Sequence, residues 1–237
     1  MKLSAPIFRL KRQAKLLSRE TNAPLHASLD EVAKREGYRG WSHLASSSSH
    51  DRPAPKLLAH FVPGDLVLLG ARPGHGKTLL GVELAVEAAR AGHRSFFFSL
   101  EETESSISNR LQGLGFDMDE TGNALVIDTS DAICADYIIE RVGHGQDDSV
   151  VVVDYLQLLD QRRRNPELAV QVKTLAGFAC TASTIIVAIS QINRSFDMEG
   201  KPLPNLSNVR LPNPVDLALF TKTCFLHNGE MRVDAVN

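Results

Sequence analysis

The sequence has few cysteines, no long hydrophobic run and almost no net charge. About 18 or more consecutive apolar residues mark a candidate membrane helix, and no such run occurs, so no membrane contact is expected. Cys134, Cys180 and Cys224 form no C-x-x-C pair, which excludes a zinc site of that kind and suits reduced thiols in the cytoplasm. Basic residues between Lys11 and Lys15 interrupt any apolar leader, so no secretory signal is expected.

The charge balance also excludes a chain that is basic throughout. Lys and Arg number 26 against 28 Asp and Glu, a net charge of −2. Contact with a nucleic acid would therefore need a local basic patch or an assembled ring. The 237 residues, 43% of them hydrophobic, suit one globular α/β domain plus a small extra module.

The first part of the chain, residues 1–45, is expected to form a small helical module. The spacing of Ile7, Leu10, Ala14 and Leu17 predicts one amphipathic helix. A second helix is expected from the capping box Ser28–Glu31 to Gly37, with Tyr38 and Trp41 in the module's core. Base stacking by these two aromatic residues is the alternative. So small a module is expected to pack on the main domain or on a partner.

A polar, proline-containing linker is expected at residues 46–56, followed by the main domain at 57–237. In that domain short apolar segments alternate with helical segments. This pattern predicts an α/β fold with a mostly parallel central sheet buried by helices on both faces. Asn228-Gly229, between apolar runs at 217–226 and 231–236, predicts a hairpin. The expected strands are 65–70, 95–100, 124–128, 150–154 and 184–190, and the expected helices are 78–91, 104–114, 135–142 and 167–182.

A Walker A phosphate loop is predicted at Ala71–Thr78 (ARPGHGKT), between an expected strand and an expected helix. Gly74 and Gly76 let backbone N–H groups approach phosphate oxygens, and the helix directs its positive dipole end at the same place. Lys77 would contact the β- and γ-phosphates, and the Thr78 hydroxyl would bind Mg²⁺. A chance glycine-rich turn is the weaker alternative. The predicted cofactors are ATP and Mg²⁺, held by Arg72, Pro73, Gly74, His75, Gly76, Lys77, Thr78 and Leu79; the His75 side chain is expected to point outward.

Three further polar residues follow expected strands. Asp154 ends VVVVD, a Walker B pattern, and would hold Mg²⁺ together with Thr78. Glu101 is the candidate base that activates water, Glu102 is the second candidate, and both would also suit the first turn of a helix. Gln191 is a candidate contact to the γ-phosphate, with an ordinary surface turn as the alternative.

Together, ARPGHGKT (71–78), FSLEE (98–102), VVVVDYLQLL (150–159) and SQINRS (190–195) resemble the C-terminal motor of DnaB-type replicative helicases, in the RecA superfamily of P-loop ATPases. The resemblance covers roughly residues 57–195. It implies a RecA-like fold with Glu101 as catalytic glutamate, Asp154 as the Walker B acid and Gln191 as γ-phosphate sensor, in a ring of identical subunits.

The sequence also departs from that family. The family's longer N-terminal domain has no counterpart in residues 1–45, and no Lys-x-Arg-x-Gly-Pro run follows 217–226, so slow hydrolysis or activation by a partner is expected. Lys222 is a possible substitute for the missing arginine.

The resemblance assigns single-stranded DNA binding to the loop 193–215, with an ordinary flexible loop as the alternative. This loop carries Arg194, Lys201 and Arg210 against Asp197 and Glu199, a weak basic excess.

Residues 162–164 (RRR) are a sharper basic cluster, a candidate contact to a nucleic-acid backbone or to a neighbouring subunit's nucleotide, with a solvated turn as the simpler interpretation. Two hypotheses for the whole chain remain open: a DnaB-like ATPase acting on single-stranded DNA, and a nucleotide-dependent assembly switch that unwinds nothing.

Overall fold

The protein is described from a computed structural model, which covers residues 4–5, 7–48, 53–113, 124–143, 148–162, 164–211 and 213–236. The chain divides into two compact units, Met1–Arg52 and Pro53–Asn237. Each unit has hydrophobic core clusters of its own, so each is described by itself.

The smaller unit consists of three helices, α1 (Ile7–Thr21), α2 (Leu25–Arg35) and α3 (Trp41–Ser48). Tyr38 and Trp41 pack against its core and stay partly exposed, so their expected place in the core is confirmed only in part. The fully buried side chains of this core are aliphatic: Leu10, Ala14, Val32, Ala33 and Leu44.

The capping box predicted at Ser28 is wrong. Helix α2 begins one turn earlier, after Pro24, and Ser28 is buried within the helix. Pro24 is the N-cap: its carbonyl accepts the Ser28 N–H at 3.2 Å, and the N–H that proline lacks is not needed at that position. The predicted end is confirmed: Gly37 has φ +84°, and Tyr38 N–H donates to the carbonyl of Ala33 at 3.0 Å.

The boundary between the two units falls inside the linker expected at residues 46–56, but the described residues of this segment are helical. Helix α3 continues to Ser48, and α4 (Pro53–Leu58) begins at Pro53, while residues 49–52 lie outside the described ranges. Ala54 and Leu57 lie three positions apart on α4 and are both buried in a core of the larger unit. A pair of apolar residues on one helical face outweighed the polar composition around it.

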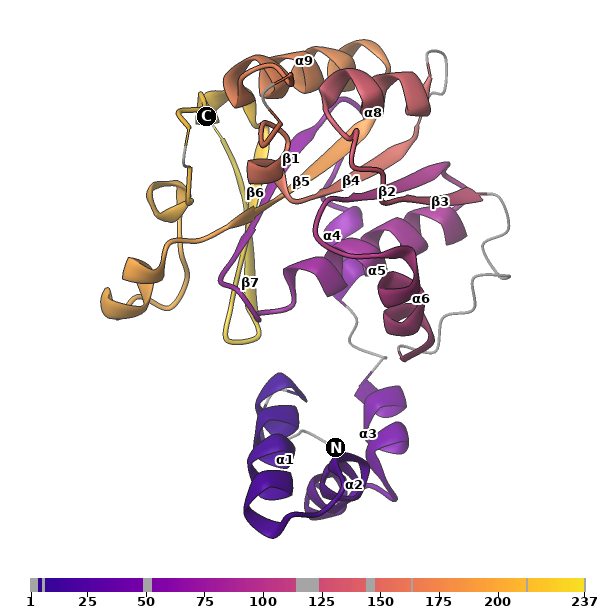
Figure 1. The fold of residues 1–237 in the computed structure, drawn as a ribbon, viewed down its shortest axis with the longest axis vertical. Helices are drawn as coiled ribbons and strands as arrows, with labels where there is room; N and C mark the ends of the chain where they lie inside the picture. The colour runs from indigo at the N-terminus through magenta and orange to yellow at the C-terminus, as the bar shows by residue number, and fades with distance from the viewer. Residues whose placement is uncertain are drawn as a thin grey trace. The chain divides into compact units, whose positions relative to one another are not determined.

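The larger unit has a seven-stranded sheet in the order β3-β2-β4-β5-β1-β6-β7 (Figure 1). Neighbouring strands are parallel except for the antiparallel pair β6–β7. The hairpin turn falls at Asn228 and Gly229, both with positive φ, as predicted. The strands are β1 (Leu66–Ala71), β2 (Ser95–Ser99), β3 (Leu125–Asp128), β4 (Val150–Asp154), β5 (Ile185–Gln191), β6 (Lys222–His227) and β7 (Glu230–Ala235).

Helices cover both faces of the sheet. Figure 1 shows α4, α5 (Lys77–Arg90) and α6 (Glu104–Gly113) on one side, and α8 (Ala135–Val142) and α9 (Leu168–Thr181) on the other. Val151 and Val153 of β4 belong to the core beneath α8 and α9, whereas Val150 and Val152 belong to the core beneath α4 and α5. Both faces of β4 are buried, which explains its uniformly apolar sequence. The predicted mostly parallel α/β fold is confirmed.

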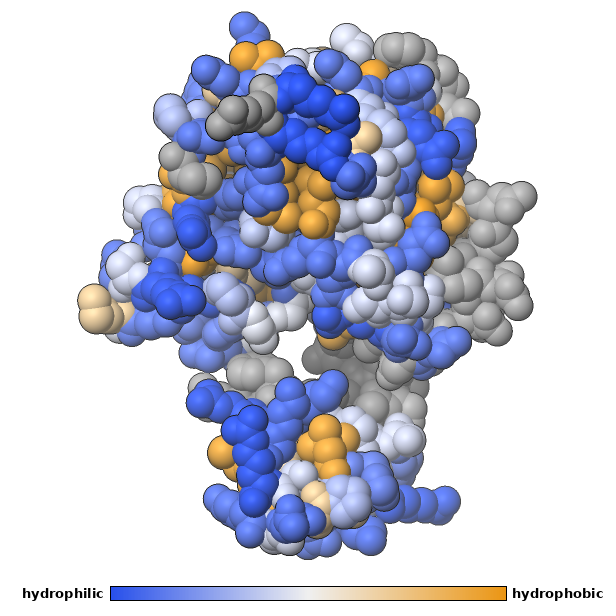
Figure 2. Space-filling view, viewed as in Figure 1, coloured by the Kyte–Doolittle hydropathy of each residue, from blue (hydrophilic) through white to orange (hydrophobic). Residues whose placement is uncertain are grey.

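None of the helices in the described ranges combines the length and hydrophobicity that a bilayer span needs. On the face seen in Figure 2, hydrophobic residues gather only in small separate patches among hydrophilic ones.

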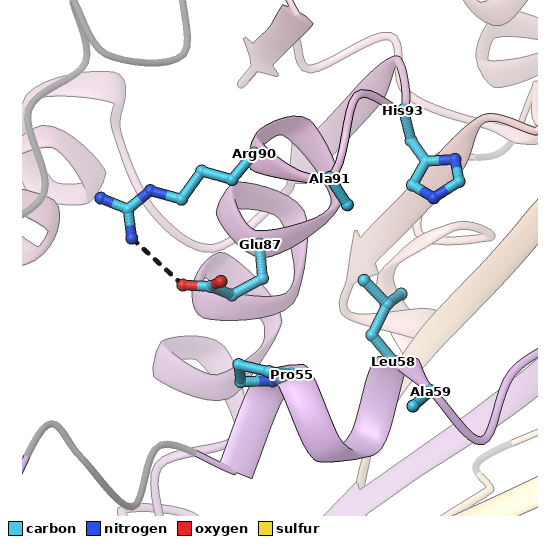
Figure 3. Close-up of a pocket in the computed structure, with 7 residues that line it drawn as sticks. All are labelled: Pro55, Leu58, Ala59, Glu87, Arg90, Ala91 and His93. Atoms are coloured by element: carbon cyan, nitrogen blue, oxygen red, sulfur yellow. Dashed lines mark hydrogen bonds and ion pairs between the residues drawn. The ribbon is translucent and has the colours of Figure 1, made fainter.

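A shallow pocket of about 500 Å³ lies between α4 and the end of α5 (Figure 3). An ion pair between Glu87 and Arg90 lies on its α5 side. The pocket is lined by Pro55, Leu58, Ala59, Glu87, Arg90, Ala91 and His93. Helix α5 begins at Lys77, and Glu87 and Arg90 of the lining lie at its other end. The pocket is therefore separate from the predicted phosphate loop.

Candidate nucleotide-binding site

The predicted site residues meet at the carboxyl-terminal edge of the parallel sheet. Asp154 pairs in register with Ser99, two residues before Glu101. Gln191 pairs with Ala71, the first residue of the predicted phosphate loop. Open parallel sheets bind ligands at this edge, because the strands end there together and the following loops diverge.

The phosphate loop has the backbone of an anion-binding turn. Gly74 has φ +81° and Gly76 has φ +86°, a region that residues with a Cβ adopt at a cost. A Cβ added at either position would meet no atom within 4 Å, so the space beside both glycines is open. Helix α5 begins directly afterwards at Lys77, and the N–H groups of a first helical turn have no partner within their helix. The loop therefore presents backbone donors where the sequence predicted them.

The Lys77 ammonium lies among carboxylates. Its Nζ is 3.3 Å from Glu101 Oε2 and 3.5 Å from Asp154 Oδ1, and the Lys77 side chain is only 7% exposed. The ring of Tyr155 lies 4.8 Å from the same nitrogen. Residues that follow two neighbouring strands, Glu101 after β2 and Asp154 and Tyr155 at the end of β4, thus surround one cation in a poorly hydrated place.

Asp154 is fully buried, and its Oδ2 has no hydrogen-bond partner among the described residues. Burial raises the pKa of this carboxyl, while the Lys77 ammonium and the nearby Thr78 hydroxyl act in the opposite direction. An orphaned buried carboxylate oxygen beside a hydroxyl is a fit for a hard divalent cation such as Mg²⁺. No group of three His, Cys, Asp or Glu side chains with metal-site spacing occurs in the described ranges. The remaining ligands of an ion here would be phosphate oxygens and water.

The two acidic residues after β2 differ in their surroundings. Glu101 is about half exposed and faces Lys77. Glu102 instead accepts hydrogen bonds from Ser106 and Arg110 of α6. Burial alone would raise the pKa of Glu102, but the hydrogen bonds from Arg110 and Ser106 outweigh it and lower that pKa. The carboxylate of Glu102 is bonded to α6, whereas that of Glu101 faces Lys77 at the predicted phosphate loop.

The side chain of Gln191 is held by Arg210, a residue of the loop that follows β5. Arg210 Nη1 lies 3.4 Å from Gln191 Oε1, and the Arg210 backbone N–H donates to the Gln191 carbonyl at 2.8 Å. The buried amide of Gln157 donates to Ser190 Oγ at 2.7 Å and to the Arg210 carbonyl at 2.5 Å. These bonds tie the end of β5 to the return of the loop.

The outward orientation expected for His75 is wrong. Its ring stacks on His227 at the end of β6, with centroids 5.0 Å apart, and its Nδ1 accepts the N–H of Asn228 at 3.4 Å. Burial lowers the pKa of His75, and the neighbouring His227 and Arg72 lower it further. The hairpin brings these residues together although they are far apart in sequence.

The remaining predicted loop residues lie at the same turn. Pro73 is exposed and Leu79 is half-buried at the start of α5. The Arg72 side chain turns away towards Asp197, so Arg72 offers this site its backbone and not its guanidinium.

The basic residues singled out from the sequence are mostly paired. Lys201 contacts Glu199, and Arg162 contacts Asp131; Arg163 lies outside the described ranges. Arg194 is exposed. Lys222 pairs with Asp65 before β1, at the opposite edge of the sheet from the phosphate loop.

Sequence reasoning missed several positioning residues. Ser99 Oγ accepts the N–H groups of Glu101 at 3.3 Å and Glu102 at 3.0 Å, and so shapes that turn. A serine preceding two acids at a strand end was an available signal for such a turn. Tyr155 and Asp197 had none, because only the fold brings them to Lys77 and Arg72.

The model of the "DnaB-like helicase C terminal domain" family matches residues 55–121 and 119–215. A probable plasmid replicative DNA helicase of Chlamydia muridarum is 28% identical over 192 residues, which is 66% of this chain and 42% of that protein. The replicative DNA helicase DnaB of Haemophilus influenzae is 26% identical over 230 residues, 81% of this chain and 48% of that protein. The chain thus spans about half the length of the curated relatives it matches.

Solved structures resemble the fold. The ATPase domain of G40P aligns with a TM-score of 0.52 at 19% identity, covering 69% of each chain. A DnaB-like replicative helicase, solved in work on its interactions with primase, aligns with a TM-score of 0.57 at 18% identity. That alignment covers 91% of this chain and 65% of the other.

Proposed function

The chain belongs to the DnaB-like helicase C-terminal domain family, and from that membership we propose that it is a magnesium-dependent ATPase of the DnaB motor type that acts on single-stranded DNA. Its RecA-like sheet brings Lys77, Asp154 and Glu101 together at the strand ends. This convergence on an open glycine loop is the observation that carries the proposal.

The phosphate loop would bind the triphosphate. Backbone N–H groups between Gly74 and Thr78 would donate to the phosphates, and the α5 dipole favours negative charge there. A triphosphate competes with Glu101 and Asp154 for the Lys77 ammonium, because its oxygens carry more charge than either carboxylate. Lys77 would move to the phosphates and release Glu101.

Thr78 and Asp154 would hold Mg²⁺ together with phosphate oxygens. When bound, this ion neutralises charge on the β- and γ-phosphate oxygens. The buried Oδ2 of Asp154 and the Thr78 hydroxyl are the groups that this chain supplies.

Glu101 would accept the proton of the attacking water. A general base needs an ionisable group that is close to the reacting centre and not otherwise engaged. Glu101 meets this condition, since among the described contacts its carboxylate is bonded only to the Lys77 ammonium, which the triphosphate would draw away. Gln191, held by Arg210, would contact the γ-phosphate from the neighbouring strand end.

The DNA assignment extends the family resemblance to the loop 193–215. Arg194 and Lys201 are exposed there, which suits contact with a phosphate backbone. A ring of subunits would be needed to gather enough positive charge, because the net charge of the chain is −2.

The test is an ATPase assay with and without oligo(dT), run alongside mass measurement in solution with and without Mg-ATP. We expect hydrolysis that single-stranded DNA accelerates, from an assembly larger than the monomer. A mass that changes with ATP while DNA leaves the rate unaltered would support the assembly switch instead and contradict the DNA assignment.

Lys77→Ala is the matching variant for the nucleotide site. Loss of the charged contact should weaken Mg-nucleotide binding by roughly 10- to 100-fold, as expected for hydrogen bonds to charged groups. Lys173→Ala, an exposed lysine of α9, is the control and should bind as the wild type does. Unchanged affinity in Lys77→Ala, measured by calorimetry, would refute the site.

A further inference from the structure

Arg72, the second residue of the phosphate loop, is anchored by a residue far away in sequence. Its Nε lies 2.9 Å from Asp197 Oδ1, and its Nη2 lies 2.6 Å from Asp197 Oδ2. The third nitrogen, Nη1, donates to the Ile192 carbonyl at 3.2 Å. The Arg72 side chain is only 12% exposed, so a two-pronged ion pair and a backbone bond fix the guanidinium in one orientation.

The anchor continues into the turn that binds phosphate. The Arg72 carbonyl accepts the N–H of His75 at 3.1 Å, with Pro73 and Gly74 between them. Proline followed by a residue with φ +81° is the pattern of a type II turn. Arg72 is the first residue of this turn, so holding Arg72 fixes the start of the phosphate loop.

Asp197 itself lies in a loop that is closed at its base. It belongs to the short 3-10 helix η4 (Arg194–Met198). The ends of the loop meet where Ile192 bridges to Val209 and Asn193 N–H donates to the Asn208 carbonyl at 2.8 Å. Movement of this loop would therefore reach Asp197.

A second path between the same two segments runs through His227 of β6. Phe196, buried beside Asp197 on η4, meets the ring of His227 edge-on with centroids 5.0 Å apart. His227 in turn stacks on His75 of the phosphate loop. Residues 196 and 197 thus support the phosphate loop at two different points.

We propose that Asp197 is a positioning residue for the nucleotide site: through the Arg72 guanidinium it holds the Pro73-Gly74 turn in the shape that binds phosphate. This role rests on the proposed function of the loop as a nucleotide site. It makes the segment 192–209 an element that controls nucleotide affinity, since whatever pulls η4 away releases Arg72.

The test is a double-mutant cycle on the full chain, with the Kd for Mg-ATPγS measured by calorimetry for Asp197→Asn, Arg72→Gln and the double variant. Each single change should weaken binding by about three- to tenfold, the effect expected for a partly exposed charged pair. The double variant should lose no more than either single one, because both remove the same interaction.

Glu199→Gln is the matched control. It removes one negative charge from the same loop, but Glu199 contacts Lys201 and Asn208 rather than the phosphate loop. Its affinity should stay within about twofold of wild type, as for surface changes distant from the site. Equal affinities for Asp197→Asn and Glu199→Gln, or single losses that multiply in the double variant, would overturn the proposal.

Hydrogen exchange of the nucleotide-free protein gives a second readout. Peptides covering residues 72–78 should exchange faster in Asp197→Asn than in wild type, and unchanged in Glu199→Gln, because the His75 N–H loses its fixed acceptor. If wild type binds no Mg-nucleotide, the proposed function fails, and this exchange difference alone decides the role of Asp197. Equal exchange in all three proteins would refute it.

Discussion

At the scale of single residues, neighbours in sequence have different partners. Glu101 and Glu102 both follow β2, but Lys77 contacts the first, whereas Ser106 and Arg110 bind the second. Identical side chains can thus serve chemistry and structure, depending on which element faces each one.

This difference predicts that two conservative changes affect different properties, catalysis in one case and stability in the other. Glu101→Gln should retain Mg-ATP binding and lower kcat by at least about 100-fold, the usual contribution of a general base. Glu102→Gln should keep most of its kcat and lower the free energy of unfolding by about 1 kcal/mol, because a charged hydrogen bond to α6 is weakened. Steady-state kinetics and urea unfolding of both variants test the pair. Normal turnover in Glu101→Gln would move the base elsewhere.

At the scale of elements, α5 lies unusually close to the sheet. Gly81 faces the strands, and a Cβ there would come 2.6 Å from Ile189 Cδ1 and 3.1 Å from Val152 Cγ1. The closeness matters for function because α5 begins with Lys77. Gly81 allows the helix to start next to the ends of β1 and β4.

Two glycine-to-alanine changes separate this packing role from helix propensity. Gly177 on α9 has no atom within 4 Å of an added Cβ, so Gly177→Ala should raise stability by about 1 kcal/mol. Gly81→Ala gains the same propensity but overfills the core, at a cost of about 1–3 kcal/mol. Urea unfolding should rank Gly81→Ala below Gly177→Ala by that cost. Equal stability of the two variants would contradict the close approach.

Asp65 lies at the end of the sheet where the parallel strands begin, opposite the phosphate loop. Its carboxylate contacts Lys222 at the start of β6 and accepts hydrogen bonds from Thr221 Oγ1 at 2.7 Å and Val62 N–H at 2.8 Å. Burial alone would raise the pKa of Asp65, but the Lys222, Val62 and Thr221 hydrogen bonds outweigh it and lower that pKa. Asp65 thus joins β1 to β6 in its ionised form.

This shift predicts a pH dependence of stability. A carboxyl with a lower pKa in the folded state stabilises fully above its ordinary value of 3.8, and the contribution is lost as the pH falls through the lowered pKa. Asp65→Asn should therefore be less stable than wild type by about 1–3 kcal/mol at neutral pH. The difference should vanish in acid. Denaturant unfolding between pH 2 and 7 measures it, with Glu140→Gln, an exposed acid of α8, as a control that should show no such trend.

At the scale of the whole molecule, the two units have separate cores. The core of the smaller unit draws on residues between Ala5 and Leu44, and the residues of the nucleotide site all lie beyond Pro53. The predicted site residues of this chain therefore all belong to the larger unit.

A fragment of residues 53–237 tests this independence. It should fold and bind Mg-ATPγS with a Kd within about twofold of that of the full chain, since every residue of the proposed site belongs to this unit, which has hydrophobic cores of its own. Calorimetry on both proteins makes the comparison. Binding that is more than tenfold weaker would show that residues 1–52 contribute to the site.

The sequence by itself determined the parallel sheet, the phosphate loop and the residues at the strand ends. Continuous apolar strands such as 150–154 can only be buried on both faces, and glycines at 74 and 76 meet a backbone requirement that is local. Local patterns failed where they competed with burial: Ser28 lies inside a helix, and Pro53 starts one.

Only the tertiary structure decided which side chains meet. It assigned Glu101 to Lys77 and Glu102 to Arg110, stacked His75 on His227, and joined Arg72 to Asp197 across 125 positions of sequence. Such pairs depend on strand order and on how loops close, which no periodicity or spacing within one segment encodes. Local patterns therefore specify the backbone that receives a phosphate, whereas contacts between distant segments specify how firmly that backbone is held.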